Sequence, residues 1–151
     1  DRGLVGSEMC IRDRIKKVPI NSLGVKMKGK RITTGSPFEA MAGYSRAVVD
    51  EDIVYISGTT GYDARNKCYP SNVKEQAIIA FSIIEAALKK AGSSLENMLR
   101  IRVYVASRSE FEEIKPIIKA NCEAAMPANT TIICDLAEEE MRVEFEVTAK
   151  I

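Results

Sequence analysis

The 151-residue sequence contains no histidine. This absence excludes Ser/His and Cys/His nucleophile pairs and every histidine-ligated metal site. Acid–base chemistry must therefore fall to Glu, Asp, Lys, Tyr or bound water. Cysteine is scarce, and Cys10, Cys68, Cys122 and Cys134 show no C-x-x-C spacing. That pattern favours buried thiols in a reducing compartment over a disulfide framework or a metal cluster, so we expect a cytoplasmic protein.

Long apolar runs and an excess of charge of one sign are also missing. No uninterrupted apolar stretch approaches the length of a membrane span. The net charge is +1, which gives no indication of nucleic acid or a membrane surface as a partner. Hydrophobic residues make up 46% of the chain and charged residues 28%, the balance of a globular protein. The length is typical of one domain with its own core.

The first residues have an unusual composition. Residues 6–14, GSEMCIRDR, resemble a read-through translation of a sequencing adapter. We therefore expect residues 1–14 to be non-native and leave them out of the fold prediction. A secretory leader is the alternative, but no continuous apolar stretch follows the charges. Residues 15–30 predict an irregular arm, and residues 31–151 a single domain.

Periodic patterns predict the regular elements. Apolar residues at helical spacing predict a helix over residues 72–91, with Asn72 and Glu75 as a capping box and Gly92 at its end. Ser109 and Glu112 predict the start of a second helix, which Pro116 should kink or restart. A turn is expected at Gly58 and Gly61. Strands are predicted at residues 45–49, 53–57, 98–106, 129–136 and 141–151, with a further short strand near 31–34.

Strict alternation in residues 141–151 indicates a strand with one covered and one polar face. The order of elements then predicts an α+β two-layer sandwich, in which two helices cover one face of a mixed or antiparallel sheet. The other face carries hydroxyls, carboxylates and arginines. Water can cover that face in a monomer, or an oligomer can close it into a shared interior.

Three segments combine a strand-like apolar run with polar side chains: residues 43–61, 127–131 and 143–149. Together they predict a polar pocket at strand ends. A phosphate-binding loop at residues 57–61 is not favoured, because the segment lacks Gly-Lys-Ser/Thr and leads into no helix. Glu144 and Glu146 share one side of the last strand. Such carboxylates act as an acid–base pair or pair with arginines such as Arg100 and Arg102.

In this order, the segments resemble the Rid family, also called the YjgF-type or reactive intermediate/imine deaminase family, which includes L-PSP endoribonuclease-like proteins. The resemblance covers residues 31–151 and is carried by GYSRAV (43–48), VYISG (54–58), EQ (75–76), AGSSL (91–95), PA (127–128) and VEFE (143–146). It implies a chorismate-mutase-like fold and a homotrimer with pockets between subunits. It also implies hydrolysis of enamines and imines to a 2-oxo acid and ammonia, without a metal or organic cofactor.

Matched position by position, the resemblance makes Tyr44 the pocket tyrosine and Ser57 and Gly58 part of the pocket wall. It makes Glu144 the residue that places or activates water. Asn129 stands where the family has an arginine that holds the substrate carboxylate. Asparagine offers only neutral donors, and losing a charge-assisted contact typically costs about 1.5–3 kcal/mol. A less acidic substrate than 2-aminoacrylate is therefore expected.

Other polar side chains extend this site. Ser57, Asn129 and Thr130 are expected to orient the substrate, and Arg46 or Arg102 to replace the missing charge or to act as ion-pair partners. Two further functions stay open. One is a trimer that binds or senses a small metabolite without turnover. The other is an endoribonuclease, which the neutral charge and the absence of histidine and of a basic patch disfavour.

Overall fold

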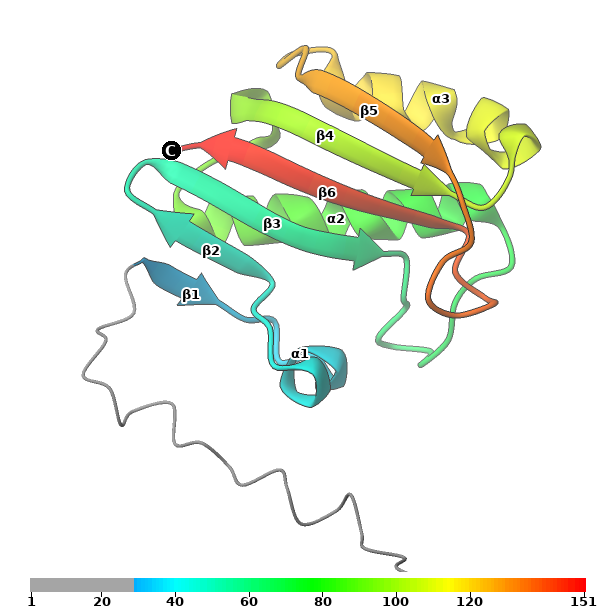
Figure 1. Cartoon of the computed structure of the whole chain (residues 1–151), viewed down its shortest axis with the longest axis horizontal. Coiled ribbons are helices and arrows are strands. Elements are labelled where there is room, and N and C mark those ends of the chain that lie inside the picture. Colours follow the sequence, from blue (N-terminus) through cyan, green and yellow to red (C-terminus); the bar gives the residue numbers. More distant parts are fainter. Residues whose placement is uncertain (1–28) are drawn as a thin grey trace, which may run out of the picture.

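A computed structural model describes residues 29–151, which form a six-stranded sheet with helices packed against it (Figure 1). The predictions for residues 1–14 and for the arm up to residue 28 lie outside this part of the chain. The arm was predicted to extend to residue 30, which is wrong at its end, because Lys30 begins the first strand. In chain order the elements are β1 (Lys30–Ile32), α1 (Pro37–Ala42), β2 (Ala47–Asp50), β3 (Ile53–Thr60), α2 (Val73–Ala91), the 3-10 turn η2 (Leu95–Asn97), β4 (Met98–Val105), α3 (Arg108–Cys122), β5 (Ala128–Ile133) and β6 (Val143–Lys150).

The sheet is mixed and has the order β1-β2-β3-β6-β4-β5. β4 and β5 pair in parallel, since α3 carries the chain back between them, and the other neighbours are antiparallel. β6, the strand with the strictest alternation, lies in the middle between β3 and β4. Its central place explains the pattern, because one face of β6 must pack on helices while the other does not.

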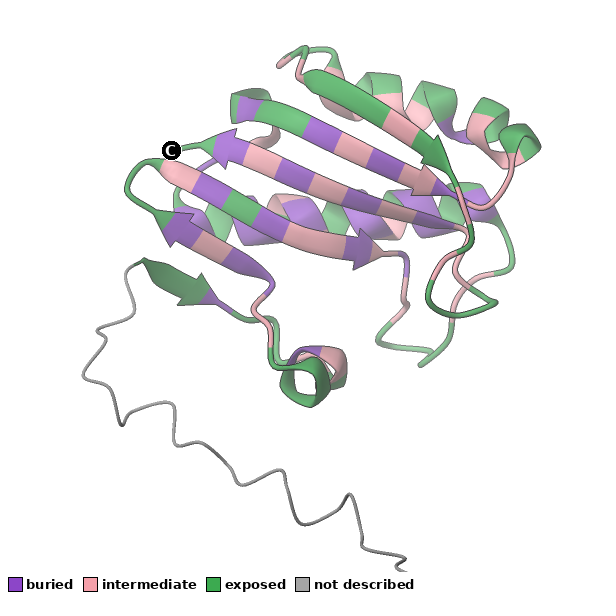
Figure 2. Ribbon diagram, in the orientation of Figure 1, coloured by how far each residue is buried: buried purple, intermediate pink, exposed green. Residues whose placement is uncertain are grey.

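The core lies between the sheet and α2 and α3, which cover the same face (Figures 1 and 2). Phe81 of α2 packs on Phe145 of β6 with ring centroids 4.5 Å apart. The helical stripe predicted for α2 is buried throughout: Val73, Ala77, Ala80, Ile84, Leu88 and Ala91. The predicted α+β two-layer architecture is therefore confirmed. We call the face that α2 and α3 leave uncovered the open face.

The ends of α2 are as predicted. Asn72 is the N-cap, and its Oδ1 accepts a hydrogen bond from the Lys74 amide at 2.8 Å. Gly92 follows the last turn with φ 88°, a left-handed conformation that favours glycine. The buried side chain of Gln76 then ties two loops to this helix. Its Nε2 donates to the carbonyls of Pro70 and Glu140, and its Oε1 accepts from the Arg142 amide.

The prediction for α3 was wrong at its start and in the restart considered at Pro116. The N-cap is Ser107, whose Oγ accepts from the Glu110 amide at 3.2 Å and donates to the Glu110 carboxylate at 2.7 Å. The helix then runs through Pro116 without a restart. Pro116 is exposed, while Ile114 before it is buried in the core and Ile117 after it packs partly there. These contacts pack both halves of the helix on the core despite the missing donor.

Three further features depart from the sequence-based expectations. A short helix, α1, precedes β2, with Ser36 as its N-cap, a proline at its first position and Gly43 at its end. β3 continues to Thr60, so the turn expected at Gly58 is wrong. Cys68 is exposed rather than buried, while Cys122 and Cys134 are half-buried, and all three are free. Local apolar spacing, on which the predicted elements rest, identifies none of these features.

Candidate functional site

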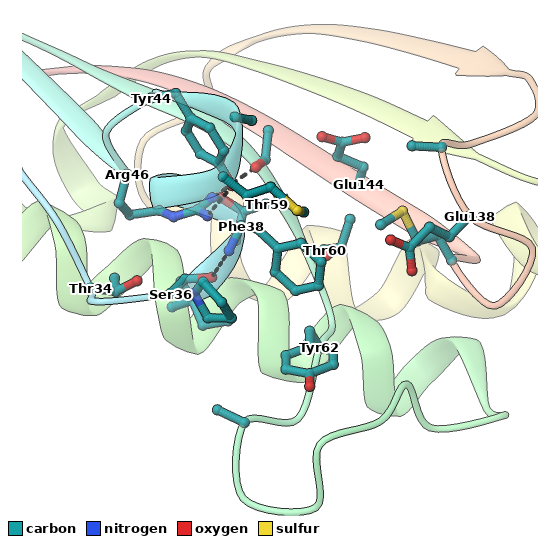
Figure 3. Close-up of a pocket in the computed structure, with 18 of the residues that line it drawn as sticks. Thr34, Ser36, Phe38, Tyr44, Arg46, Thr59, Thr60, Tyr62, Glu138 and Glu144 are labelled. Atoms are coloured by element: carbon teal, nitrogen blue, oxygen red, sulfur yellow. Dashed lines mark hydrogen bonds between the residues drawn. The ribbon is translucent and has the colours of Figure 1, made fainter. Parts of the chain in front are cut away.

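A cavity of about 470 Å³ opens where α1, the end of β3, the start of β6 and two loops meet (Figure 3). Polar side chains come from three separate parts of the chain: Tyr44 and Arg46 just before β2, Thr59 and Thr60 on β3, and Glu144 on β6. Tyr62 and Tyr69 add aromatic walls from the loop after β3. The first and third polar segments of the sequence thus meet here, as predicted.

Arg46 is the polar centre of this cavity, and only 7% of it is exposed. Its Nη1 donates to the Gly58 carbonyl at 2.7 Å and to Thr59 Oγ1 at 2.9 Å. Its Nη2 donates to the Tyr44 hydroxyl at 3.1 Å (Figure 3). Because a guanidinium has five N–H donors, these bonds and the ion pair described next occupy most of its capacity.

Glu39 of α1 is the counter-charge of Arg46, and both side chains are buried. Arg46 Nε lies 3.3 Å from Glu39 Oε1. The Thr34 amide and hydroxyl also donate to this carboxylate, at 3.0 and 2.6 Å. Burial by itself raises the pKa of Glu39. The bonds from Thr34 and the charge of Arg46 outweigh that effect, so the pKa lies below its usual value. Glu39 is therefore a carboxylate that holds α1 against β2 and β3.

Glu144 is the second carboxylate of the site, and its environment differs. Burial raises its pKa above the usual value, the charge of Arg46 opposes that shift, and Glu146 adds to it. Among the described residues, none donates a hydrogen bond to the Glu144 carboxylate. The cavity therefore contains a half-buried carboxylate with a raised pKa whose oxygens are left for water or a ligand. These are the properties of a general base.

A β-bulge brings the wall of the cavity up to Glu144. The register of β3 against β6 shifts between Ile56 and Thr59, so Ser57 and Gly58 oppose one residue of β6. A Cβ at Gly58 would overlap Oε1 of Glu144, so a larger residue there would force this carboxylate to move. The Ser57 hydroxyl donates to the Ser45 carbonyl at 2.7 Å, and Ser57 lies beside the cavity rather than among its lining residues.

Substituting Gly58 tests this close approach. We expect Gly58→Ala to lower the free energy of unfolding by about 1–3 kcal/mol, as overpacking does, because Glu144 must move. Adding Glu144→Asp shortens the side chain and should recover part of the loss. Thermal denaturation of Gly58→Ala, of the double variant and of the wild type measures this. An unchanged melting temperature in Gly58→Ala would contradict the packing of Glu144 against Gly58.

Asn129 and Thr130 lie elsewhere in the same chain. Both are exposed on β5, the edge strand, with β6 and β4 between it and β3. At a strand spacing of about 4.8 Å, three steps separate them from β3 by about 14 Å. Asn129 lines a shallow hollow beside α3 with Cys122 and Met126, and its Oδ1 accepts from the Thr131 hydroxyl at 3.0 Å. Their role at the cavity stays a prediction that needs a neighbouring copy of the chain.

Arg46 and Arg102, the two arginines considered as substitutes for the missing arginine charge at Asn129, lie in different places. Arg46 reaches the cavity. Arg102 lies on the open face, where its Nη1 is 2.7 Å from Glu146 Oε1. The Tyr104 hydroxyl donates to the other oxygen of Glu146 at 3.3 Å. Arg102 is thus an ion-pair partner of Glu146, the second of the two roles considered for it, and not a cation of the cavity.

Sequence reasoning missed α1 and the aromatic walls. A signal for α1 was present: Ser36 and Pro37 form an N-cap with proline at the first position, and Gly43 has φ 71°. For Tyr62 and Tyr69 no such signal exists, because they come from an irregular loop. Their place depends on ring contacts: Tyr62 packs edge-on against Phe38 at 5.4 Å and against Tyr69 at 5.2 Å.

Residues 29–151 contain no group of three or more His, Cys, Asp or Glu side chains placed to hold a metal ion. Within the same residues, no helix combines the length and the apolar character needed to cross a membrane.

The fold and the comparisons together define the class of protein. The sequence profile described as Endoribonuclease L-PSP matches residues 34–151, and the chain belongs to this family, also known as YjgF or Rid. The fold matches a crystal structure of a YjgF/YER057c/UK114 family member from Mycobacterium tuberculosis, with a TM-score of 0.73 and 29% identity over 81% of this chain and 98% of the other. Yeast Mmf1 shares the fold, with a TM-score of 0.69 and 23% identity over 82% and 97%.

Curated relatives agree with this assignment. A Bos taurus protein named 2-iminobutanoate/2-iminopropanoate deaminase is 31% identical over 121 residues, which cover 80% of this chain and 88% of the relative. A Capra hircus protein of the same name is 30% identical over 119 residues, 78% and 87% of the two chains. The predicted family membership is therefore confirmed.

Proposed function

We propose that this protein hydrolyses a small imine or enamine to a carbonyl compound and ammonia, with Glu144 as the general base. The observation that carries the proposal is the state of Glu144: half-buried, with a raised pKa and no hydrogen bond from any described residue. The names of the mammalian relatives support the same class of reaction.

In this proposal a water molecule between Glu144 and the substrate attacks the imine carbon. Glu144 takes a proton from the water as the new C–O bond forms and the π electrons of the C=N bond move to nitrogen. Glu144 then returns the proton to nitrogen, which gives a carbinolamine. Glu144 next takes the proton of the carbinolamine hydroxyl group and passes it to nitrogen, so that the C=O bond forms as the C–N bond breaks and ammonia leaves. The Tyr44 hydroxyl accepts a bond from Arg46 Nη2, so its own proton is left to donate to the bound substrate.

We further propose a homotrimer in which a neighbouring subunit brings Asn129 and Thr130 to the cavity. Their distance from the cavity within one chain supports this arrangement. So does the apolar side chain of Ile132 on the same strand, which is 45% exposed. Light scattering with size exclusion should give three times the mass of one chain. A stable monomer would rule out a site shared between subunits.

Catalysis is tested with a set of imines made in situ, which includes 2-iminobutanoate made by a PLP-dependent dehydratase. The measured quantity is the rate at which the carbonyl product forms, compared with the spontaneous rate. We expect the native protein to accelerate hydrolysis of at least one imine. Asn129→Arg should improve hydrolysis of 2-iminobutanoate by about tenfold or more, as a new charge-assisted contact would. Efficient hydrolysis of 2-iminobutanoate by the native protein would refute the importance of Asn129.

The second candidate is a trimer that binds a metabolite without turnover. It is favoured by the bonding of Arg46, whose charge is already held by Glu39 and is not free for a substrate carboxylate. If neither the native protein nor Asn129→Arg hydrolysed any imine of the set while both still bound ligand, binding without turnover would be the function.

A further inference from the structure

The charges around the cavity do not suit an anionic ligand. Arg46 is the one cation among the described lining residues, and Glu39 neutralises it at 3.3 Å. Two more carboxylates, Glu138 at the rim and Glu144 inside, then leave an excess of negative charge (Figure 3). A substrate carboxylate placed here would meet like charge, with no free cation among the described lining residues to pair with it.

The remaining walls are aromatic and apolar. Phe38 comes from α1, and Tyr62 and Tyr69 come from the loop after β3. Their edge-to-face packing, with centroids 5.4 and 5.2 Å apart, holds the three rings in fixed positions. Aromatic faces combined with carboxylates attract organic cations, through the ring quadrupole and through charge. The site therefore offers an apolar surface for a ligand body and negative charge for a cationic centre.

We propose that this cavity takes organic cations without a carboxylate and, given the proposed hydrolase function, that its substrate is the protonated imine of such a compound. Glu144 beside the nitrogen keeps the imine protonated, and the protonated form is the better electrophile. Water adds to the imine carbon while the C=N π pair moves to nitrogen, and Glu144 relays a proton from the water to nitrogen. The C–N bond then breaks as the C=O bond forms, and the hydroxyl proton passes through Glu144 to the leaving ammonia. An iminium ion and water thus give a carbonyl compound and ammonium.

Matched ligands separate charge from shape. Choline and 3,3-dimethylbutan-1-ol have the same form and differ in the charge of the quaternary centre. In NMR titrations of the full chain, we expect choline to bind about tenfold more tightly. Tyr62→Leu and Glu144→Gln should each reduce this preference, whereas Tyr55→Leu and Glu146→Gln, which lie outside the cavity lining, should not. Equal binding of the two probes, or a preference that Tyr62→Leu and Glu144→Gln both leave intact, would overturn the proposal.

Matched substrates test the reaction itself. Benzaldimine is made from benzylamine by an amine oxidase, and 2-imino-2-phenylacetate from phenylglycine by an amino-acid oxidase. The two imines differ in that benzaldimine lacks the carboxylate. We expect the acceleration to be about tenfold larger for benzaldimine. Faster hydrolysis of the carboxylate-bearing imine would overturn this inference and leave the hydrolase function standing. Selective binding of choline without hydrolysis of either imine would overturn the hydrolase function and retain the cation site.

Discussion

Replacing Glu144 by glutamine is expected to reduce imine hydrolysis by about 10²–10⁴-fold, the usual contribution of a general base. The same change should raise the melting temperature at neutral pH. Glutamine keeps the shape of the side chain but cannot accept a proton from water. It also removes a charge that is half-buried and receives no hydrogen bond from the described residues. The variant should thus be less active and more stable than the wild type, as expected where a catalytic residue lowers the stability of the fold.

The stability gain should depend on pH with a defined sign. Burial, and secondarily Glu146, raise the pKa of Glu144 in the folded state above its usual value of 4.5, although Arg46 opposes the shift. Between 4.5 and that raised pKa the folded chain binds more protons than the unfolded chain, so the contribution of Glu144 to stability falls as pH rises. The free energy of unfolding of Glu144→Gln should therefore increase relative to that of the wild type as pH rises through this window. Below the window the two proteins should be equally stable.

Thermal denaturation from pH 4 to pH 8 measures this difference. Glu146→Gln serves as the control, because Glu146 lies on the same side of β6 but outside the cavity lining and is paired with Arg102. It should retain hydrolysis. If Glu144→Gln were less stable than the wild type at neutral pH, the carboxylate would have to be stabilised in the fold. The general-base assignment would then lose its support.

Breaking the buried pair of Glu39 and Arg46 is expected to have the largest effect on folding. Glu39→Gln should lower the free energy of unfolding by about 3 kcal/mol, because it leaves the buried guanidinium without its counter-charge. For a chain of this length, that corresponds to a melting temperature lower by about 6–12 °C. Arg46→Met should cost a similar amount. The double variant should lose less than the sum of the two, since no unpaired charge is then left buried.

The control for this prediction is the exposed pair of Lys150 and Asp52, at 3.2 Å. Asp52→Asn should change stability by less than about 1 kcal/mol. The effect of Glu39→Gln should also shrink in acid. The pKa of Glu39 is lowered, so its stabilisation is present above its usual value of 4.5 and is lost as pH falls through the folded-state value. Strict additivity of the two single losses in the double variant would refute a direct interaction.

The strands and long helices were predictable where one face of an element is covered along its whole length. In β6, burial alternates from Val143 to Ala149, so the pattern of period two appears in the sequence itself. In α2, the buried stripe repeats at helical spacing. The start of α3 was misplaced by two residues because Ser107 and Ser109 carry the same capping signal. Only the bonds to Glu110 distinguish them.

The sequence by itself determined the family, the α+β architecture and the candidacy of Tyr44, Gly58 and Glu144, because local periodicity and short motifs carry that information. The tertiary structure decided which of these residues meet. The bulge at Ser57 and Gly58 sets the approach to Glu144, and the ion pair with Glu39 determines what the charge of Arg46 can do. Both depend on contacts between strands and helices distant in sequence. Burial and pairing, rather than residue type, then set the charge and the proton affinity of the site.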